Sequence, residues 1–225
     1  MPSSRYERAA RNAGFRLIAG VDEAGRGALF GPVFAAALVL DPARPIRGLD
    51  DSKLLDPERR EVLAERIRER ALAWAVAGAD AFEIDRINIL EASRLAMRRA
   101  ILKLNLTADY LLIDAIRVDL ATAQKPLIHG DALSFSIAAA SILAKTERDR
   151  ALVAWHAAFP GFDLASNKGY GTPTHLAGLE SHGPTPLHRF SFAPVRAAAK
   201  IPHQQHQWAG YPQLKSEQGE LFACR

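Results

Sequence analysis

Two adjacent carboxylates, Asp22 and Glu23, end an apolar run that begins at Leu17. An unpaired ionised carboxylate is costly to bury, so a buried strand seldom ends in two acids unless a cation lies between them. Gly25-Arg26-Gly27 follows, and glycine lets a backbone come close to a ligand. The pattern indicates a metal site beside a phosphate or sugar site. An ordinary β-turn with exposed acids is the competing interpretation of these residues alone.

Two further acids, Asp114 and Asp131, also follow apolar segments. Neighbouring strands would bring Asp22 and Asp114 together, and Asp131 could point to the same place. Four close acids repel one another, and hard divalent cations such as Mg²⁺ or Mn²⁺ relieve that repulsion. Two metal ions about 3.5–4 Å apart are a known arrangement for in-line attack on a phosphodiester. Taken singly, Asp131 would be read as a helix N-cap and Asp114 as an exposed strand end. The repetition of the pattern favours the site.

The elements that must position these acids alternate between apolar runs and helical periodicity. Asp56-Pro57 has the residue types of an N-cap and a first helical position. Strands are predicted at 17–23, 33–40, 73–79, 110–114 and, from a weaker pattern, 126–131. Long helices are predicted at 84–104 and 135–158, with shorter helical pieces near 174–181 and 186–200.

Composition bounds the class of protein. The 225 residues are 48% hydrophobic and 24% charged, which is typical of a globular chain. Cys224 is the only cysteine, which excludes an intrachain disulfide. Residues 1–16 lack the apolar region of a signal peptide, and the apolar runs are too short for membrane spans, so a cytoplasmic location is expected. The net charge of +4 permits a polyanionic partner. The expected divisions are an N-terminal segment (1–16), a core (17–158), a helical extension (159–200) and a flexible tail (201–225).

Five blocks in order resemble the bacterial ribonuclease HII family. The first is the stretch from Gly20 to Gly27 with Gly31-Pro32-Val33, and the second is Asp51-Ser52-Lys53-Leu54. Ala28, Phe30 and Ala115 depart from the usual pattern of the family. The remaining blocks are Gly130-Asp131 with Ser136 to Lys145 and Arg148-Asp149, then Lys168-Gly169-Tyr170-Gly171-Thr172 with His175, and finally His188-Arg189 through Val195.

The resemblance implies an α/β, RNase H-like fold: a five-stranded mixed sheet flanked by helices, with a helical C-terminal extension. Asp22, Glu23, Asp114 and Asp131 match the four catalytic acids of the family, which hold two Mg²⁺ or Mn²⁺ ions. The implied activity is endonucleolytic hydrolysis of the RNA strand of RNA–DNA hybrids. It includes nicking of duplex DNA 5′ to a single embedded ribonucleotide, which leaves 3′-hydroxyl and 5′-phosphate ends.

Candidate substrate contacts lie around the glycine loop. Gly25, Arg26 and Gly27 offer backbone groups to a sugar, and the 2′-hydroxyl distinguishes RNA from DNA. The resemblance implies that Tyr170 lays its ring on the neighbouring deoxyribose; packing over a loop is its alternative. Lysines are expected at backbone phosphates, with a solvated surface position as the alternative. His175, His182 and His188 are expected to be structural or exposed, because Mg²⁺ prefers oxygen. The candidate lysines are Lys53, Lys145 and Lys168.

Two other functions compete with the nuclease. The glycines at 25, 27 and 31 fit neither the P-loop nor the dinucleotide-binding pattern. A non-catalytic protein that binds RNA–DNA hybrids with the same fold would be expected to lack at least one of the four acids, and all four are present. An assay on a duplex with one ribonucleotide separates these functions.

The tail carries a short motif, Gln218-Gly219-Glu220-Leu221-Phe222, in a polar stretch. It resembles the pentapeptide by which bacterial repair proteins bind the sliding clamp, with Gln218, Leu221 and Phe222 as the defining positions. Short apolar anchors on flexible tails dock into grooves of partner proteins. Chance occurrence, or folding of the tail back onto the domain, is the alternative.

Overall fold

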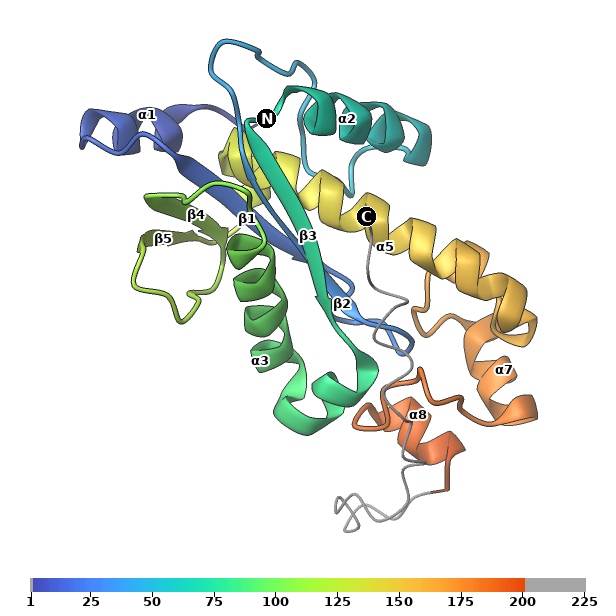
Figure 1. The fold of residues 1–225 in the computed structure, drawn as a ribbon. Helices are drawn as coiled ribbons and strands as arrows, with labels where there is room; N and C mark the ends of the chain where they lie inside the picture. Colours follow the sequence, from blue (N-terminus) through green and yellow to red (C-terminus); the bar gives the residue numbers. More distant parts are fainter. Residues whose placement is uncertain (1, 201–225) are drawn as a thin grey trace.

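A five-stranded mixed sheet forms the centre of the molecule in the computed structural model, which describes residues 2–200 (Figure 1). The strand order is β3-β2-β1-β4-β5. The central strand β1 pairs antiparallel with β2 and parallel with β4. The sheet and its flanking helices confirm the predicted five-stranded mixed sheet of an α/β protein. The strands are β1 (Ile18–Ala24), β2 (Val33–Val39), β3 (Ala73–Ala79), β4 (Tyr110–Asp114) and β5 (Ala123–Leu127).

Helices cover both faces of the sheet. Because side chains alternate along a strand, β2 sends Ala35 and Ala37 into the core beneath α3 and sends Ala36 and Leu38 into the core beneath α5. Helix α2 packs outside α5 in the second core. The helices around the sheet are α1 (Arg5–Asn12), α2 (Pro57–Arg70), α3 (Ala81–Leu102), α4 (Gly130–Leu133) and α5 (Phe135–Ala158).

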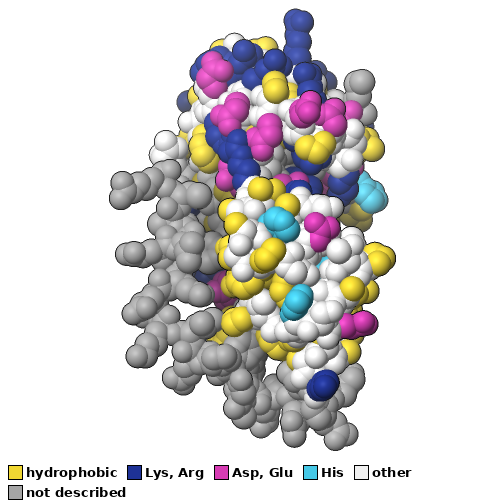
Figure 2. All heavy atoms as spheres, turned by 90° about the vertical axis from the view of Figure 1, so that its right-hand side faces the viewer, with side chains coloured by type: hydrophobic (Ala, Val, Ile, Leu, Met, Phe, Trp, Pro, Cys, Tyr) yellow, Lys and Arg dark blue, Asp and Glu magenta, His cyan; other side chains and the backbone are white. Residues whose placement is uncertain are grey.

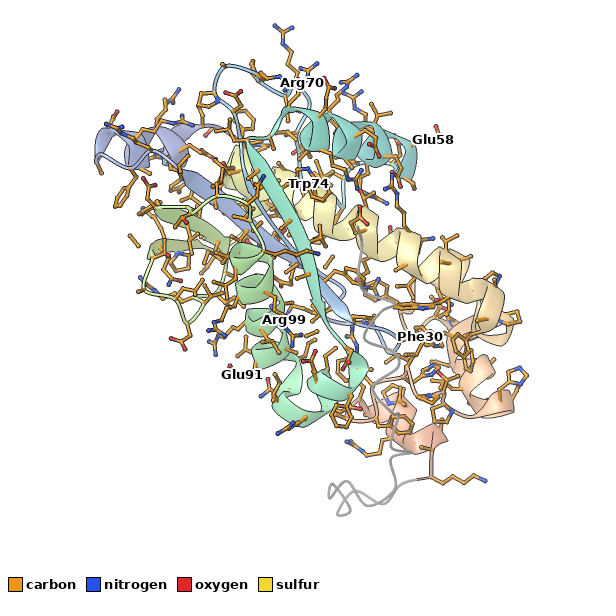
Figure 3. All side chains as sticks on the ribbon, viewed as in Figure 1. Phe30, Glu58, Arg70, Trp74, Glu91 and Arg99 are labelled. Atoms are coloured by element: carbon orange, nitrogen blue, oxygen red, sulfur yellow. The ribbon has the colours of Figure 1, made fainter. Side chains whose placement is uncertain are left out.

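Helix starts follow the side-chain chemistry. The Arg59 N–H donates to the Asp56 carboxylate at 2.7 Å, which confirms the predicted N-cap of α2. Asp80 and Glu83 form a reciprocal capping box at the start of α3, where Ala81 precedes the predicted first residue. Arg99 of α3 then reaches back to Glu83 and to the Gly78 carbonyl at the end of β3 (Figure 3).

The C-terminal segment forms its own small core against the glycine loop. Phe30 is fully buried there and meets the rings of Trp155, Phe159 and His188 (Figure 3). This segment therefore closes over one end of the sheet. Its elements are the 3₁₀ helix η1 (Pro160–Phe162), α6 (Leu164–Asn167), α7 (Pro173–His182) and α8 (Ala193–Ala198).

Two predicted elements have the wrong bounds. The fifth strand ends at Leu127 rather than at 131, because His129 adopts a left-handed φ of 56° and turns the chain into α4. Pro126 is tolerated in β5 because this strand lies at the edge of the sheet. The helical piece predicted near 186–200 is only α8, since a tight turn at Thr185 and the buried Arg189 hold the preceding residues.

Charged side chains are distributed unevenly over one face of the molecule. Figure 2 shows Lys, Arg, Asp and Glu side chains crowded over the upper part of the molecule, whereas the lower part is mostly uncharged and carries histidines. Among residues 2–200, no helix combines the length and apolar composition that crossing a membrane requires.

Candidate active site

Three carboxylates meet where β1 and β4 end. Parallel pairing places Val21 opposite Ile113, so the acids that follow them come together at one edge of the sheet. One oxygen from each of Asp22, Glu23 and Asp114 lies within 4.8 Å of the others. The strands that carry Asp22 and Asp114 are therefore neighbours, the arrangement that would bring these two acids together, and this explains how residues 92 positions apart share a site.

Mutual repulsion and burial dominate the electrostatics of this cluster. Burial, together with the charges of Glu23 and Asp114, raises the pKa of Asp22 well above its ordinary value. Burial also raises the pKa of Glu23, which Arg26 at 3.4 Å partly offsets. Burial raises the pKa of Asp114 as well, although the Gly130 N–H donates to its carboxylate at 2.6 Å. Nearby positive charge from the protein therefore does not offset the burial and mutual repulsion of the three carboxylates.

A hard divalent cation fits this donor set. All three ligands are carboxylates, the type that Mg²⁺ and Mn²⁺ prefer. Glu23 Oε2 is buried and has no hydrogen-bond partner within residues 2–200. A buried oxygen without a partner carries a desolvation cost that a cation would remove.

Asp131 lies beside the cluster rather than in it. Its side chain is 8% exposed, and Oδ2 is 3.6 Å from Lys53 Nζ. Its charge contributes to the raised pKa of Asp114, which places it near the other acids. Although burial lowers the pKa of Lys53, the carboxylates of Asp131, Asp51 and Asp22 together raise it. Lys53 is thus the cation nearest this side of the site, on a side chain that is mostly exposed.

The glycine loop and Tyr170 lie next to the acids. Gly25 has a φ of 95°, which strains any residue with a Cβ atom. A Cβ atom on Gly27 would lie 3.8 Å from the Tyr170 ring, so the loop and the ring are neighbours. The Leu29 N–H donates to the Gly169 carbonyl at 2.8 Å and joins the two segments. Arg26, Gly27 and Tyr170 therefore form one surface beside Glu23.

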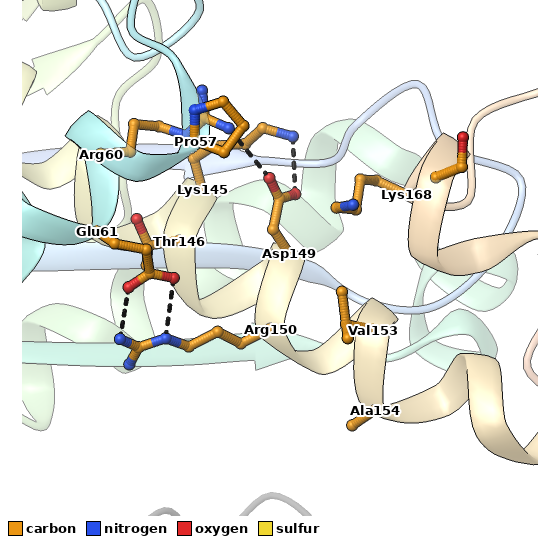
Figure 4. Close-up of a pocket in the computed structure, with 11 residues that line it drawn as sticks. Pro57, Arg60, Glu61, Lys145, Thr146, Asp149, Arg150, Val153, Ala154 and Lys168 are labelled. Atoms are coloured by element: carbon orange, nitrogen blue, oxygen red, sulfur yellow. Dashed lines mark hydrogen bonds and ion pairs between the residues drawn. The ribbon is translucent and has the colours of Figure 1, made fainter.

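The other two candidate lysines line a cleft of about 640 Å³ between α2, α5 and α6 (Figure 4). Lys145 is paired with Asp149 at 2.8 Å, and Arg60 reaches the same carboxylate at 3.5 Å. Lys168 donates to the carbonyl of Ala165. Both lysines thus have partners within the protein, whereas Lys53 faces the acids.

Two buried serines support the site, although the sequence analysis assigned them no role. The Ser141 hydroxyl of α5 lowers the pKa of the Asp22 carboxylate, and its oxygen lies 2.8 Å from Ser52 Oγ. Both serines stand inside the blocks that carry the family resemblance, which was the signal available. Together they connect β1, α5 and the loop that carries Lys53.

A buried histidine pair holds the loop that carries Tyr170. The Thr185 N–H donates to Nδ1 of His188, so the proton of the neutral ring belongs on Nε2, 3.1 Å from His175 Nε2. His175 Nδ1 then donates to the Tyr170 carbonyl at 3.0 Å. Burial lowers the pKa of His188 to about 3, which keeps it neutral. As predicted, His175 and His188 have structural positions.

Comparison with known sequences decides the family. The family model described as ribonuclease HII matches residues 19–195. The chain belongs to the ribonuclease HII family. Ribonuclease HII of Solibacter usitatus is 59% identical over 196 residues, which cover 87% of this chain and 86% of that protein. The chain is accordingly a type 2 ribonuclease H, an endonuclease of the class that acts on RNA–DNA hybrids.

Solved structures share the fold. Ribonuclease H2 from Pyrococcus horikoshii superposes with a TM-score of 0.70 at 24% identity, covering 82% of this chain and 98% of that one. A complex of PCNA with the RNase HII of Archaeoglobus fulgidus gives a TM-score of 0.67 at 25% identity, covering 80% and 97%. The predicted tail motif, Gln218 to Phe222, lies outside the described residues.

Proposed function

We propose that this ribonuclease HII cleaves the RNA strand of hybrids and nicks duplex DNA 5′ to a single ribonucleotide, with two metal ions. The observation that carries the proposal is the carboxylate cluster of Asp22, Glu23 and Asp114 beside the Gly25–Gly27 loop. Asp131 lies next to this cluster and Lys53 faces it. Acids that repel one another beside a loop open to a sugar suit phosphodiester hydrolysis.

In the proposed reaction, water attacks the phosphorus atom on the 5′ side of the ribonucleotide. The bond from phosphorus to the 3′ oxygen breaks, which leaves a 3′-hydroxyl and a 5′-phosphate. The four acids would hold two Mg²⁺ or Mn²⁺ ions, which supply stabilisation of the charge that develops on the phosphate. Lys53 would contact a backbone phosphate through its exposed ammonium group.

Recognition of the sugar is assigned to the glycine loop and the tyrosine. Backbone groups of Gly25, Arg26 and Gly27 would contact the 2′-hydroxyl, the group that only RNA carries. Tyr170 is partly exposed next to Gly27, and its ring would stack on the neighbouring deoxyribose. Lys145 and Lys168 would contact backbone phosphates through the ammonium N–H groups that their present partners leave free.

The direct test is cleavage of three duplexes: an RNA–DNA hybrid, DNA with one ribonucleotide, and all-DNA. Each is assayed with Mg²⁺, with Mn²⁺ and with chelator. We expect metal-dependent cleavage of the first two and none of the third. Asp22→Asn and Asp114→Asn should abolish cleavage but leave duplex binding, since an amide lacks the charge. Near-normal rates in either variant would refute the assignment.

The tyrosine has its own test. Tyr170→Ala should lose activity selectively at the single-ribonucleotide junction, because a long hybrid offers 2′-hydroxyls at many positions. Tyr170→Phe is the matched control, since it keeps the ring. Equal losses on both substrates would show that Tyr170 only packs.

A partner is proposed for the tail. The Archaeoglobus relative was solved with PCNA, and the Gln218–Phe222 motif supports binding of this chain to a sliding clamp. Leu221 and Phe222 would fill an apolar groove, with an affinity on the order of micromolar because few residues are buried. A tail peptide is titrated against the clamp beside its Leu221→Ala, Phe222→Ala version. Equal binding of the two peptides would exclude the motif.

A further inference from the structure

Two fully buried arginines, Arg148 and Arg189, lie beneath the glycine loop. Arg189 donates from Nε to the Gly31 carbonyl and from Nη1 to the Arg26 carbonyl, each at 2.9 Å. Its role in holding the loop backbone is therefore explained by its hydrogen bonds. Arg148 differs, because its Nε, Nη1 and Nη2 atoms have no hydrogen-bond partner within residues 2–200.

A buried guanidinium without partners is energetically expensive. Burial accordingly lowers the pKa of Arg148. Leucine or methionine would fill the same space without this desolvation cost, so packing alone does not account for an arginine here. The groups that Arg148 contacts must supply the reason for its charge.

Those contacts are the glycine loop and the tyrosine ring. Arg148 Cζ lies 5.3 Å from the centre of the Tyr170 ring, and Lys145 Nζ lies 5.9 Å from it. Residues 145 and 148 are three positions apart on α5, so both approach the ring from the same helix face. A Cβ atom at Gly25 would lie 2.0 Å from Arg148 Nε, which makes the arginine the floor of the loop.

The backbone of Tyr170 is held by other groups. Its carbonyl accepts from His175, and its N–H donates to the Asn167 carbonyl at 3.0 Å. These bonds leave the direction of the side chain open. Tyr170 is 38% exposed, and α5 places two cations against its ring.

We propose that Arg148 is a positioning residue for junction recognition, which holds the Tyr170 ring by cation–π attraction and supports Gly25 without touching the substrate. The inference rests on the role proposed for Tyr170. A desolvated cation attracts an aromatic face more strongly than an exposed one. Because no hydrogen bond from residues 2–200 competes for the Arg148 guanidinium, its charge is available to the ring.

The test is a double-mutant cycle on the ratio of kcat/KM for the single-ribonucleotide duplex to kcat/KM for the long hybrid. Arg148→Met keeps the stem and removes the charge, and should lower this ratio about fivefold to tenfold. The double variant with Tyr170→Ala should fall no further than Tyr170→Ala alone, since both act through one ring. Arg148→Lys should restore most of the ratio.

Controls separate positioning from packing. Arg150→Met is the same change two residues along α5, where the side chain pairs with Glu61 at the surface, and it should leave the ratio unchanged. The melting temperature of Arg148→Met should not fall, because the lost group had no hydrogen bonds. If Arg148→Met does not fold, Arg148→Gln is taken through the same cycle.

The outcomes distinguish the two proposals. If Tyr170→Ala lowers the ratio but Arg148→Met does not, or if their effects add, the positioning role of Arg148 is overturned. If Tyr170→Ala itself leaves the ratio unchanged, the role proposed for Tyr170 fails and the inference fails with it.

Discussion

Two clusters of like charge lie side by side in this molecule, and they differ in access. The acids at the ends of β1 and β4 include Asp114, which is only partly buried, so a cation from solution can reach them. The arginines beneath the glycine loop, Arg148 and Arg189, are completely buried. An accessible cluster stores repulsion that a ligand relieves, whereas a sealed cluster can act only on its neighbours.

A substitution that forces β1, the strand of Asp22 and Glu23, away from α5 should have the largest effect on stability. A Cβ atom at Gly20 would lie 2.1 Å from the Ser136 backbone carbon, and a helix backbone cannot move aside. Gly20→Ala should therefore destabilise the protein by several kcal/mol, on the scale of severe overpacking. Denaturant unfolding measures the change. Gly27→Ala is the matched control for stability, since its φ is not left-handed and its Cβ atom would meet only the Tyr170 ring, at an ordinary contact distance of 3.8 Å; equal losses would contradict the steric explanation.

Neutralising one acid of the accessible cluster should have the next largest effect, a change of a few kcal/mol at most in the stability of the metal-free protein. Asp22→Asn removes a buried charge that Glu23 and Asp114 repel. The metal-free variant should melt at a higher temperature than the metal-free wild type. Mn²⁺ should raise the melting temperature of the wild type but much less that of the variant. Thermal denaturation with chelator and with metal gives both results, and a destabilised metal-free variant would count against stored repulsion.

On the side of the glycine loop, the buried pair His175 and His188 should make the stability of the protein depend on pH. His188 stays neutral in the folded protein down to a pKa of about 3, whereas an unfolded histidine titrates near about 6.5. Between these values the unfolded chain binds more protons, so stability falls as the pH drops, by up to about 1.4 kcal/mol per pH unit. His188→Gln should lower this slope by about one proton. Denaturant unfolding from about pH 8 to 4 measures it, and an unchanged slope would show that His188 is protonated when folded.

The smallest effect is expected at Ala115, directly after Asp114. Its φ of 53° lies in the left-handed region, which costs a residue with a Cβ atom about 1 kcal/mol. Ala115→Gly relieves this strain but gives the unfolded chain more freedom, so we expect a change of at most about 1 kcal/mol. The melting temperature of the variant tests this, and a large loss would mean that the methyl group packs.

Local pattern determined much of this protein. Apolar runs predicted four of the five strands, and the Asp56 cap and the extent of 135–158 were also correct. These succeeded because strand burial and helix capping depend on residues close in sequence. Asp22, Asp114 and Asp131 were expected to share one place because each follows an apolar segment, with Glu23 next to Asp22; the structure groups Asp22, Glu23 and Asp114.

Tertiary structure decided the rest. The register between Val21 and Ile113 places the acids within 4.8 Å, and no local pattern specifies a pairing so distant in sequence. The left-handed turn at His129 places Asp131 beside the cluster rather than at a strand end. Nor does any pattern show that Arg148 has no hydrogen-bond partner within residues 2–200, because an arginine on a helix is ordinarily solvated. Only the packing of α5 against the glycine loop buries its charge under Tyr170.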